Sequence, residues 1–236
     1  TAAREAAFAP YPGGAVFNTA IALGRLGAPA GFVSGLSTDF FGSLLTTALE
    51  DSDVETAHAI RSDRPTTLAF VRLVDGQASY AFYDENTAGR MLTPEDMPDL
   101  PDNVEAVFFG GISLVVEPCG SAYEALMERL APTRALMIDP NIRPGFIADP
   151  DGYRARIRRM MAMADIVKLS DEDMKWLLGP GSPADHARAL MKDGVSVVCI
   201  TEGGEGAVGY CAHGAIRVGA EKVEVVDTVG AGDTFN

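Results

Sequence analysis

The C-terminal residues combine a glycine-rich turn with a carboxylate that could act as a base. The small residues Gly230, Ala231 and Gly232 let neighbouring backbone N–H groups converge on one point, and Asp233 opens a predicted helix. Such a turn can form an anion hole for the charge that develops on a transferring phosphoryl group. Asp233 would then accept the proton of an attacking hydroxyl. The alternative is a turn whose Asp only caps a helix, and spacing alone leaves both open.

Two further segments carry chemically useful groups in turns. The pair Gly13-Gly14 allows a close backbone approach, and Asn18 offers a donor and an acceptor to a sugar diol, although it could instead only cap a helix. The stretch Thr201-Glu-Gly203-Gly-Glu-Gly206 follows a predicted strand. A lone glycine loop indicates only a turn, but its place after a strand and before the Gly230 turn favours a cradle for ATP phosphates.

Alternating strands and helices position these loops. Helices are also predicted at 17–26 and 42–50 and a strand at 30–34, while the regular part begins at residue 104. There the pattern predicts strands at 105–109, 135–139, 166–169 and 195–201, with helices at 121–130, 153–163, 171–178 and 184–193 between them. Two further strands, 207–211 and 215–218, would form a hairpin. This order predicts an α/β fold with a doubly wound, mostly parallel sheet, whose ligands bind beyond the carboxyl ends of the strands.

Residues 66–83 break the regular alternation. Two runs of β-forming residues flank Asp75-Gly76, which predicts a β-hairpin. We interpret it as part of a small β lid, made of about 53–65 and 66–90, inserted into a single α/β domain of residues 1–236. The lid is also a possible homodimer surface.

Composition excludes several classes of protein. The 236 residues are 47% hydrophobic and 22% charged, which is typical of a soluble globular domain. A net charge of −14 argues against a nucleic-acid partner. No apolar run is long enough to span a membrane, and the widely spaced Cys119, Cys199 and Cys211 predict free thiols in a reducing compartment. The prediction is therefore a cytoplasmic protein that binds no membrane.

The segment Asp227-Thr-Val-Gly-Ala-Gly-Asp233 resembles the C-terminal signature of the ribokinase-like, or phosphofructokinase-B, sugar kinases. The resemblance implies that Asp233 is the catalytic base and that the Gly230–Gly232 backbone forms the anion hole. It also implies that Asp227 and the carbonyl of Val229 help to hold an activating monovalent cation, which the resemblance identifies as K⁺. The substrates would be ATP and a small sugar.

Other segments are similar to the family's remaining motifs. Residues 13–27 resemble its N-terminal signature, in which the glycines approach the sugar and the Asn binds its hydroxyls, and residues 201–206 match its T-x-G-x-x-G nucleotide loop. Asp139-Pro-Asn141-Ile-Arg143 resembles the D-x-N-x-R segment of fructokinases and 2-keto-3-deoxygluconate kinases. Arg143 would reach the substrate or the transferring phosphoryl group, or else form an exposed ion pair.

The stretch Lys168-Leu-Ser170-Asp-Glu-Asp173 resembles fructokinases and falls where the family often has N-x-x-E. The resemblance places Lys168 and Ser170 at the nucleotide and implies that Asp173 organises Mg²⁺ through water. Ser-x-x-Asp at the start of an apolar helix is also close to a capping box, which is the structural alternative.

Residues 82–88 bear on the identity of the sugar. Asp84 and Glu85 stand where a kinase for an acid sugar would need a cation, so a neutral sugar is favoured, with D-fructose first. The alternatives are a 2-keto-3-deoxygluconate kinase, a ribokinase, or a non-catalytic sugar or nucleotide sensor on the same fold. A dinucleotide-binding oxidoreductase would need G-x-G-x-x-G after an early strand, which the sequence lacks.

Relative to the family pattern, an N-terminal strand that ends in an Asp and the segment after Asn236 are missing. We therefore expect this chain to be part of a longer protein.

Overall fold

A six-stranded sheet forms the centre of the fold. The computed structural model describes residues 8–74, 77–224 and 230–236. The strands β7 (Ala106–Gly110), β8 (Ala135–Asp139), β9 (Ile166–Ser170) and β10 (Val197–Thr201) are parallel neighbours in chain order. The antiparallel strands β11 (Ala207–Cys211) and β12 (Gly214–Val218) complete one edge. The predicted mostly parallel sheet is confirmed.

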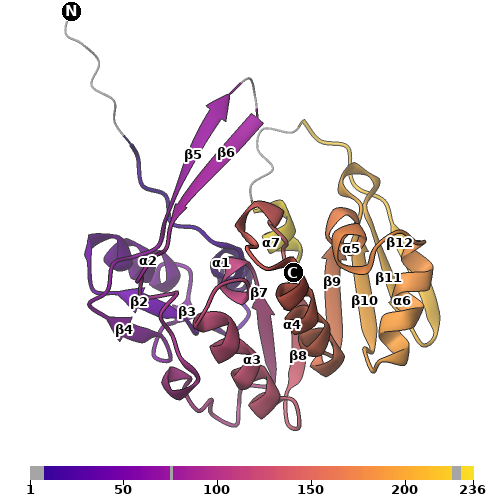
Figure 1. Cartoon of the computed structure of the whole chain (residues 1–236), viewed down its shortest axis with the longest axis horizontal. Coiled ribbons are helices and arrows are strands. Elements are labelled where there is room, and N and C mark those ends of the chain that lie inside the picture. Colours follow the sequence, from indigo (N-terminus) through magenta and orange to yellow (C-terminus); the bar gives the residue numbers. More distant parts are fainter. Residues whose placement is uncertain (1–7, 75–76, 225–229) are drawn as a thin grey trace, which may run out of the picture.

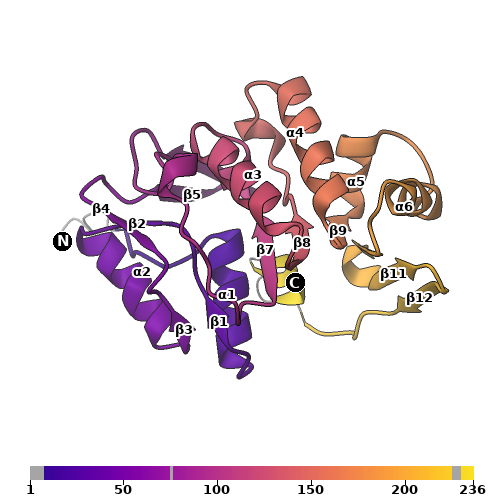
Figure 2. The same cartoon turned by 90° about the horizontal axis from the view of Figure 1, so that it is seen from below.

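Helices cover the sheet. Between the parallel strands run α3 (Cys119–Leu130), α4 (Pro150–Met163), α5 (Asp171–Leu178) and α6 (Pro183–Lys192). Figure 2 shows these four helices on one side of the sheet, with α1 (Ala15–Arg25) and the short α7 (Ala231–Phe235) on the other. Side chains from the sheet and the four helices form the main core, among them the fully buried Met127, Ile138, Ile157, Val167, Leu169 and Val198.

Local capping signals fix where several of these helices begin. The hydroxyl of Ser182 accepts the backbone N–H of Asp185 at the start of α6, and the Asp149 carboxylate accepts that of Gly152 at the start of α4. Each helix has a proline in its first turn, where the missing N–H costs no hydrogen bond. The sequence therefore contains its own start signals for these elements.

The N-terminal part forms a second, smaller core. Two parallel strand pairs lie beside α1 and α2 (Phe40–Glu50): β1 (Ala30–Gly31) with β3 (Val54–Glu55), and β2 (Gly35–Ser37) with β4 (Ile60–Ser62). The strand predicted at 30–34 is therefore wrong in extent, because the chain leaves β3 after two residues and pairs with β4 from residue 35. The range 53–65, predicted as part of the lid, contains β3 and β4, which pair with β1 and β2 in this N-terminal part.

The predicted hairpin is present as β5 (Leu68–Val74) and β6 (Gln77–Tyr83), and Figure 1 shows it projecting from the body of the molecule. Its Asp75-Gly76 turn lies outside the described residues. The Asp39 carboxylate anchors its first strand, because it accepts both the N–H and the hydroxyl of Thr66 while it caps α2 through Gly42. Burial acts against the charge, yet these hydrogen bonds hold the pKa of Asp39 below its ordinary value. Asp39 is thus structural.

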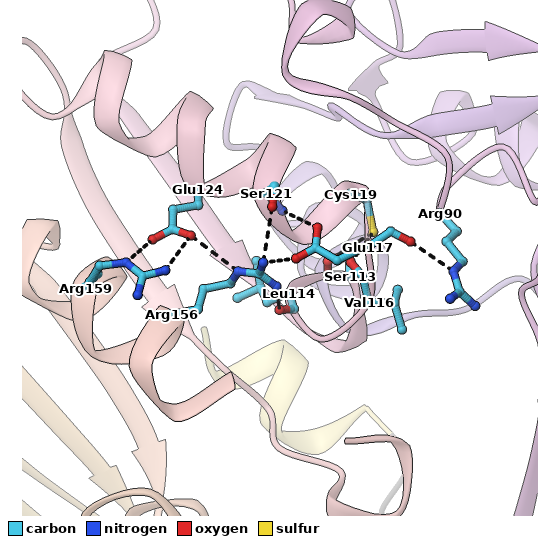
Figure 3. A network of polar contacts seen from close by, with 10 residues as sticks. All are labelled: Arg90, Ser113, Leu114, Val116, Glu117, Cys119, Ser121, Glu124, Arg156 and Arg159. Atoms are coloured by element: carbon cyan, nitrogen blue, oxygen red, sulfur yellow. Dashed lines mark hydrogen bonds and ion pairs between the residues drawn. The ribbon is translucent and has the colours of Figure 1, made fainter. Parts of the chain in front are cut away.

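A polar network joins Arg90, which follows the second strand of the hairpin, to α3 and α4 (Figure 3). Arg90 donates to the Asp84 carboxylate (3.1 Å), just after β6, and to the carbonyl of Glu117 (3.2 Å), just before α3. The Glu117 carboxylate pairs with Arg156 of α4, which also donates to Glu124 of α3 (3.3 Å). The base of the hairpin is therefore held at its first strand by Asp39 and at its second strand by Arg90.

None of the helices within the described ranges is long and apolar enough to cross a membrane. The three cysteines are free thiols, as predicted.

Candidate active site

Asp233 lies in a buried position where α1 and α7 meet. Only 8% of the residue is exposed. Its Oδ2 accepts the Asn18 side-chain amide of α1 at 2.8 Å, and its Oδ1 accepts that of Asn141, after β8, at 3.0 Å. The Thr19 hydroxyl donates to its backbone carbonyl at 2.7 Å. These contacts fix the carboxylate on two sides.

The paired glycines lie beside this carboxylate. Gly14 caps α1 at its N-terminus, and its carbonyl accepts the backbone N–H of Asn18 at 2.7 Å. The alternative that Asn18 only caps a helix is therefore wrong. A Cβ atom at Gly13 would lie 3.9 Å from Asn18 Oδ1. Gly13, Gly14 and Asn18, three of the four predicted sugar-binding residues, thus form one cluster with the predicted base.

The turn before Asp233 begins with a left-handed glycine and leads directly into α7. Gly230 adopts a left-handed conformation (φ 80°) and forms the N-cap of α7. A Cβ atom at Gly230 would lie 3.7 Å from Asn18 Nδ2, and one at Gly232 would lie 3.4 Å from Lys168 Nζ. Asp233 itself is not the capping residue, since its carboxylate bonds to two side chains. The simple capping alternative is wrong here too.

A buried ion pair lies beneath this turn. Lys168 Nζ donates to Asp139 Oδ2 at 2.8 Å, and both residues are almost fully buried. The same oxygen accepts the side-chain amide of Asn236 at 3.0 Å, while Asp139 Oδ1 accepts the backbone N–H of Asn141 at 3.1 Å. Asp139, at the end of β8, therefore links the end of α7 to the loop that holds Asp233.

Asp173 is a second buried carboxyl group at the same edge of the sheet. The Ser170 hydroxyl caps α5 by accepting the Asp173 N–H at 3.0 Å, so the predicted cap is present. Burial, and next the negative charge of Asp139, raise the pKa of Asp173 to about 6, although hydrogen bonds from Ser170 and the Ile142 backbone and the charge of Arg143 act against them. A carboxyl group with such a pKa often marks a functional site.

The carboxylates at this edge of the sheet suit a metal ion that is bound partly by the phosphate groups of a nucleotide. Within the described residues, no group of three or more His, Cys, Asp or Glu could hold a metal ion. Mg²⁺ in phosphoryl-transfer enzymes is usually bound by one or two carboxylates together with substrate phosphates. Asp173 fits that role, whereas Asp139 is already paired with Lys168. Asp227 and Val229, the predicted ligands of a monovalent cation, lie outside the described residues.

The predicted nucleotide loop follows β10. Thr201 lies directly opposite Ser170 in the sheet register, so both are at the carboxyl edge. Gly203 (φ 55°) and Gly206 (φ 97°) are left-handed, and a side chain at Gly206 would overlap the Val218 carbonyl oxygen. Gly206 therefore also has a structural role in the turn to β11.

Arg143 is exposed and donates to the carbonyl of Ile142 at 3.0 Å. In the described part of the chain it forms no ion pair, so the ion-pair alternative receives no support. Close by, the Phe82 ring of β6 packs edge-on against Phe146 with 4.4 Å between centroids. The hairpin thus contacts the loop that carries Asn141 and Arg143.

Sequence reasoning missed the contacts of four residues: Thr19, Asp139, Asn141 and Asn236. Asp139 and Asn141 belong to the D-x-N-x-R segment, and the end of a parallel strand was a sufficient signal to inspect them. No sequence pattern indicated the contacts of Thr19 or Asn236.

Comparison with known proteins agrees with this geometry. The family described as pfkB family carbohydrate kinase matches residues 1–236. A fructokinase of Rhizobium leguminosarum bv. trifolii is 54% identical over 235 residues, which cover 98% of this chain and 71% of that protein. Fructokinase-1 of Zea mays is 38% identical over 245 residues, covering 99% of this chain and 74% of that protein.

Solved structures give the same result. A fructokinase from Vibrio cholerae O395, in its fructose-, ADP- and calcium-bound form, has a TM-score of 0.83 and 27% identity, and the match covers 94% of this chain and 72% of that one. An aminoimidazole riboside kinase from Salmonella enterica, complexed with aminoimidazole riboside and an ATP analogue, has a TM-score of 0.85 and 27% identity, covering 98% and 76%. The chain belongs to the pfkB family of carbohydrate kinases.

Proposed function

We propose that this chain carries the active site of an ATP-dependent fructokinase, which transfers the γ-phosphoryl group to a hydroxyl of D-fructose. The observation that carries the proposal is the buried Asp233 carboxylate, held 2.8 Å from the Asn18 amide beside the Gly13-Gly14 pair. A base must lie within hydrogen-bond reach of the alcohol it deprotonates, and this cluster offers hydrogen-bonding groups for a sugar at that distance. The fructokinase relatives support fructose over other sugars.

In this proposal one group of residues binds the sugar and accepts its proton, and another group contacts the transferring phosphoryl group. Gly13, Gly14 and Asn18 bind the sugar, and Asp233 takes the proton of the attacking hydroxyl as the oxygen–phosphorus bond forms. The backbone N–H groups of the Gly230–Gly232 turn face the transferring phosphoryl group, and the nearby Lys168 ammonium adds positive charge on that side.

The nucleotide would lie along the carboxyl ends of β9 and β10. The proposed contacts come from Lys168, Ser170, Thr201, Gly203 and Gly206, with Arg143 at the sugar or the transferring phosphoryl group. When bound, Mg²⁺ through Asp173 neutralises phosphate charge, and K⁺ is proposed at Asp227 and Val229. Solved relatives are bound to ADP with calcium or potassium, which supports nucleotide and cation use.

The β5–β6 hairpin is the proposed lid, because Phe82 contacts the loop that follows β8. Asp84 is paired with Arg90, so its charge is largely balanced and the preference for a neutral sugar rests chiefly on the relatives. The exposed rings of Phe8, Phe70 and Tyr83 pack edge-on along the hairpin. A homodimer through this hairpin stays a prediction.

An Asp233→Asn variant of the full-length protein tests the proposal. We expect kcat with fructose, ATP and Mg²⁺ to fall by about 10²–10⁴-fold, with little change in KM, because the amide cannot accept the proton. Asp171→Asn, at a partly exposed acid of α5 that pairs with Lys175, is the matched control and should keep its activity. Full activity of the Asp233 variant would refute the mechanism, and sugar-dependent thermal stabilisation of the wild type without turnover would favour a sensor.

A further inference from the structure

Asn141 connects the buried Asp139 to the carboxylate of Asp233. Its backbone N–H donates to Asp139 Oδ1 at 3.1 Å, and its side-chain amide donates to Asp233 Oδ1 at 3.0 Å. We propose that Asn141 is a positioning residue that holds the Asp233 carboxylate in place for proton transfer. This inference rests on the fructokinase function proposed above.

The chemistry of the carboxylate fixes the orientation of both asparagine side chains. An ionised carboxylate can only accept hydrogen bonds, so Asn18 and Asn141 must both present their NH₂ groups to Asp233. Each oxygen receives one amide, at 2.8 Å and 3.0 Å, and keeps further lone pairs for a substrate hydroxyl. Two donors from different elements restrict both the position and the rotation of the carboxylate plane.

The backbone at Asn141 is held in an uncommon conformation. Its φ is 47°, in the left-handed region that non-glycine residues rarely adopt, although Asn tolerates it better than most. The buried Asp139 carboxylate holds this turn by accepting the N–H of Asn141, and the backbone of Ile142 acts on the pKa of the buried Asp173 carboxyl group. Such a conformation persists where the surroundings enforce it, and these sites are often functional.

Asp139 is itself fixed, which makes the support rigid. Its other oxygen accepts the Lys168 ammonium at 2.8 Å and the Asn236 amide at 3.0 Å. A continuous series of contacts therefore runs from the core of the sheet at Lys168 through Asp139 and Asn141 to Asp233. The proposed base is held from the sheet as well as from its own short helix.

The two asparagines should differ in their kinetic effects. Asn18 contacts Asp233 and also lies beside Gly13, where the sugar is proposed to bind, so its loss should raise the KM for fructose as well as lower kcat. Asn141 reaches Asp233 from the loop after β8, so its loss should misplace the base and leave sugar binding unchanged. A misplacement of about 1 Å can cost about 10²-fold in rate.

The test uses Asn141→Gly and Asn141→Asp in the full-length protein, with steady-state kinetics and melting temperatures. Glycine accepts φ 47° without strain, so the first variant removes the amide at little cost to folding. Aspartate keeps the shape but replaces the donor with an acceptor. We expect both to lower kcat by about 10–100-fold while KM for fructose and ATP stays within about threefold. The control Asp53→Gly, at another left-handed residue (φ 56°), should match the wild type.

The combination with Asp233→Asn separates this inference from the proposed function. If Asn141 acts through Asp233, the double variant is no slower than Asp233→Asn alone. Wild-type kcat in Asn141→Gly, or a loss confined to KM and melting temperature, would overturn the positioning role while the fructokinase stands. Full turnover by Asp233→Asn would instead overturn the proposed function itself.

Discussion

Replacing Lys168 with methionine would remove one partner of an ion pair that is shielded from water. The side chains of Lys168 and Asp139 are 5% and 1% exposed, and their charged atoms are 2.8 Å apart. In the variant the carboxylate keeps the N–H of Asn141 and the amide of Asn236 but has lost its counter-ion. Breaking a buried pair in this way typically costs about 3–5 kcal/mol of unfolding free energy.

The two remaining hydrogen bonds favour the lower end of that range, about 3 kcal/mol. At about 2–4 °C per kcal/mol for a domain of this size, the melting temperature should fall by roughly 6–12 °C. Asp139→Asn alone should cost a similar amount, because it leaves the ammonium buried without a counter-ion. The double variant Lys168→Met/Asp139→Asn leaves no unpaired charge and should recover most of the loss.

Urea unfolding of the four proteins, followed by circular dichroism and by the fluorescence of Trp176, measures these free energies as a double-mutant cycle. Lys175→Met is the matched control, since Lys175 pairs with Asp171 on the exposed face of α5 and its loss should leave the midpoint unchanged. A loss below about 1 kcal/mol in Lys168→Met, or strictly additive single variants, would refute the assignment of a strongly coupled buried pair.

Two further predictions concern stability. The pKa of Asp173 is raised to about 6 from its ordinary value of 3.8, so the contribution of this carboxyl group to folding is fully present below about pH 4 and is lost as the pH rises through about 6. Without nucleotide or metal, Asp173→Asn should therefore have a free energy of unfolding roughly 1–3 kcal/mol higher than the wild type at pH 7.5. It should lose that advantage at pH 4. Urea unfolding that shows the same pH dependence for both proteins would contradict this prediction. A Cβ atom at Gly24 of α1 would overlap the Ser52 carbonyl oxygen, so Gly24→Ala should lower the free energy of unfolding by about 1–3 kcal/mol. The control Gly145→Ala adds a Cβ atom that meets nothing within 4 Å, and it should melt like the wild type. Calorimetry of both variants checks this prediction.

The regular part of the fold could be predicted from the sequence because its signals are local. From β7 to β10 each strand is a short apolar run, and caps such as Ser170 and Ser182 begin the helices that follow. The N-terminal layer is different, since the two residues of β1 pair with β3 and the chain then pairs with β4. Strand length there depends on partners more than twenty residues away, which a local pattern does not reveal.

The candidate site could be predicted in part. The meeting of Asn18 with Asp233, 215 residues apart, followed only from the family resemblance, because no local pattern brings α1 and α7 together. In the segment 139–143 the sequence directed attention to Arg143, an exposed cation. The contact to Asp233 instead comes from Asn141, through a left-handed backbone and a 3.0 Å hydrogen bond that spacing cannot reveal.

The types of donor around Asp233 support its proposed role as a base. A lysine or arginine in place of Asn18 or Asn141 would pair with the carboxylate by a strong, charge-assisted bond and compete with a sugar hydroxyl for its oxygens. Neutral amides orient the carboxylate and leave lone pairs available. The Lys168 ammonium lies instead beside Gly232 and is held there by Asp139. Positive charge therefore lies toward the turn proposed to face the phosphoryl group, and the proposed proton acceptor lies toward the proposed sugar site. Phosphoryl transfer to an alcohol requires such a separation.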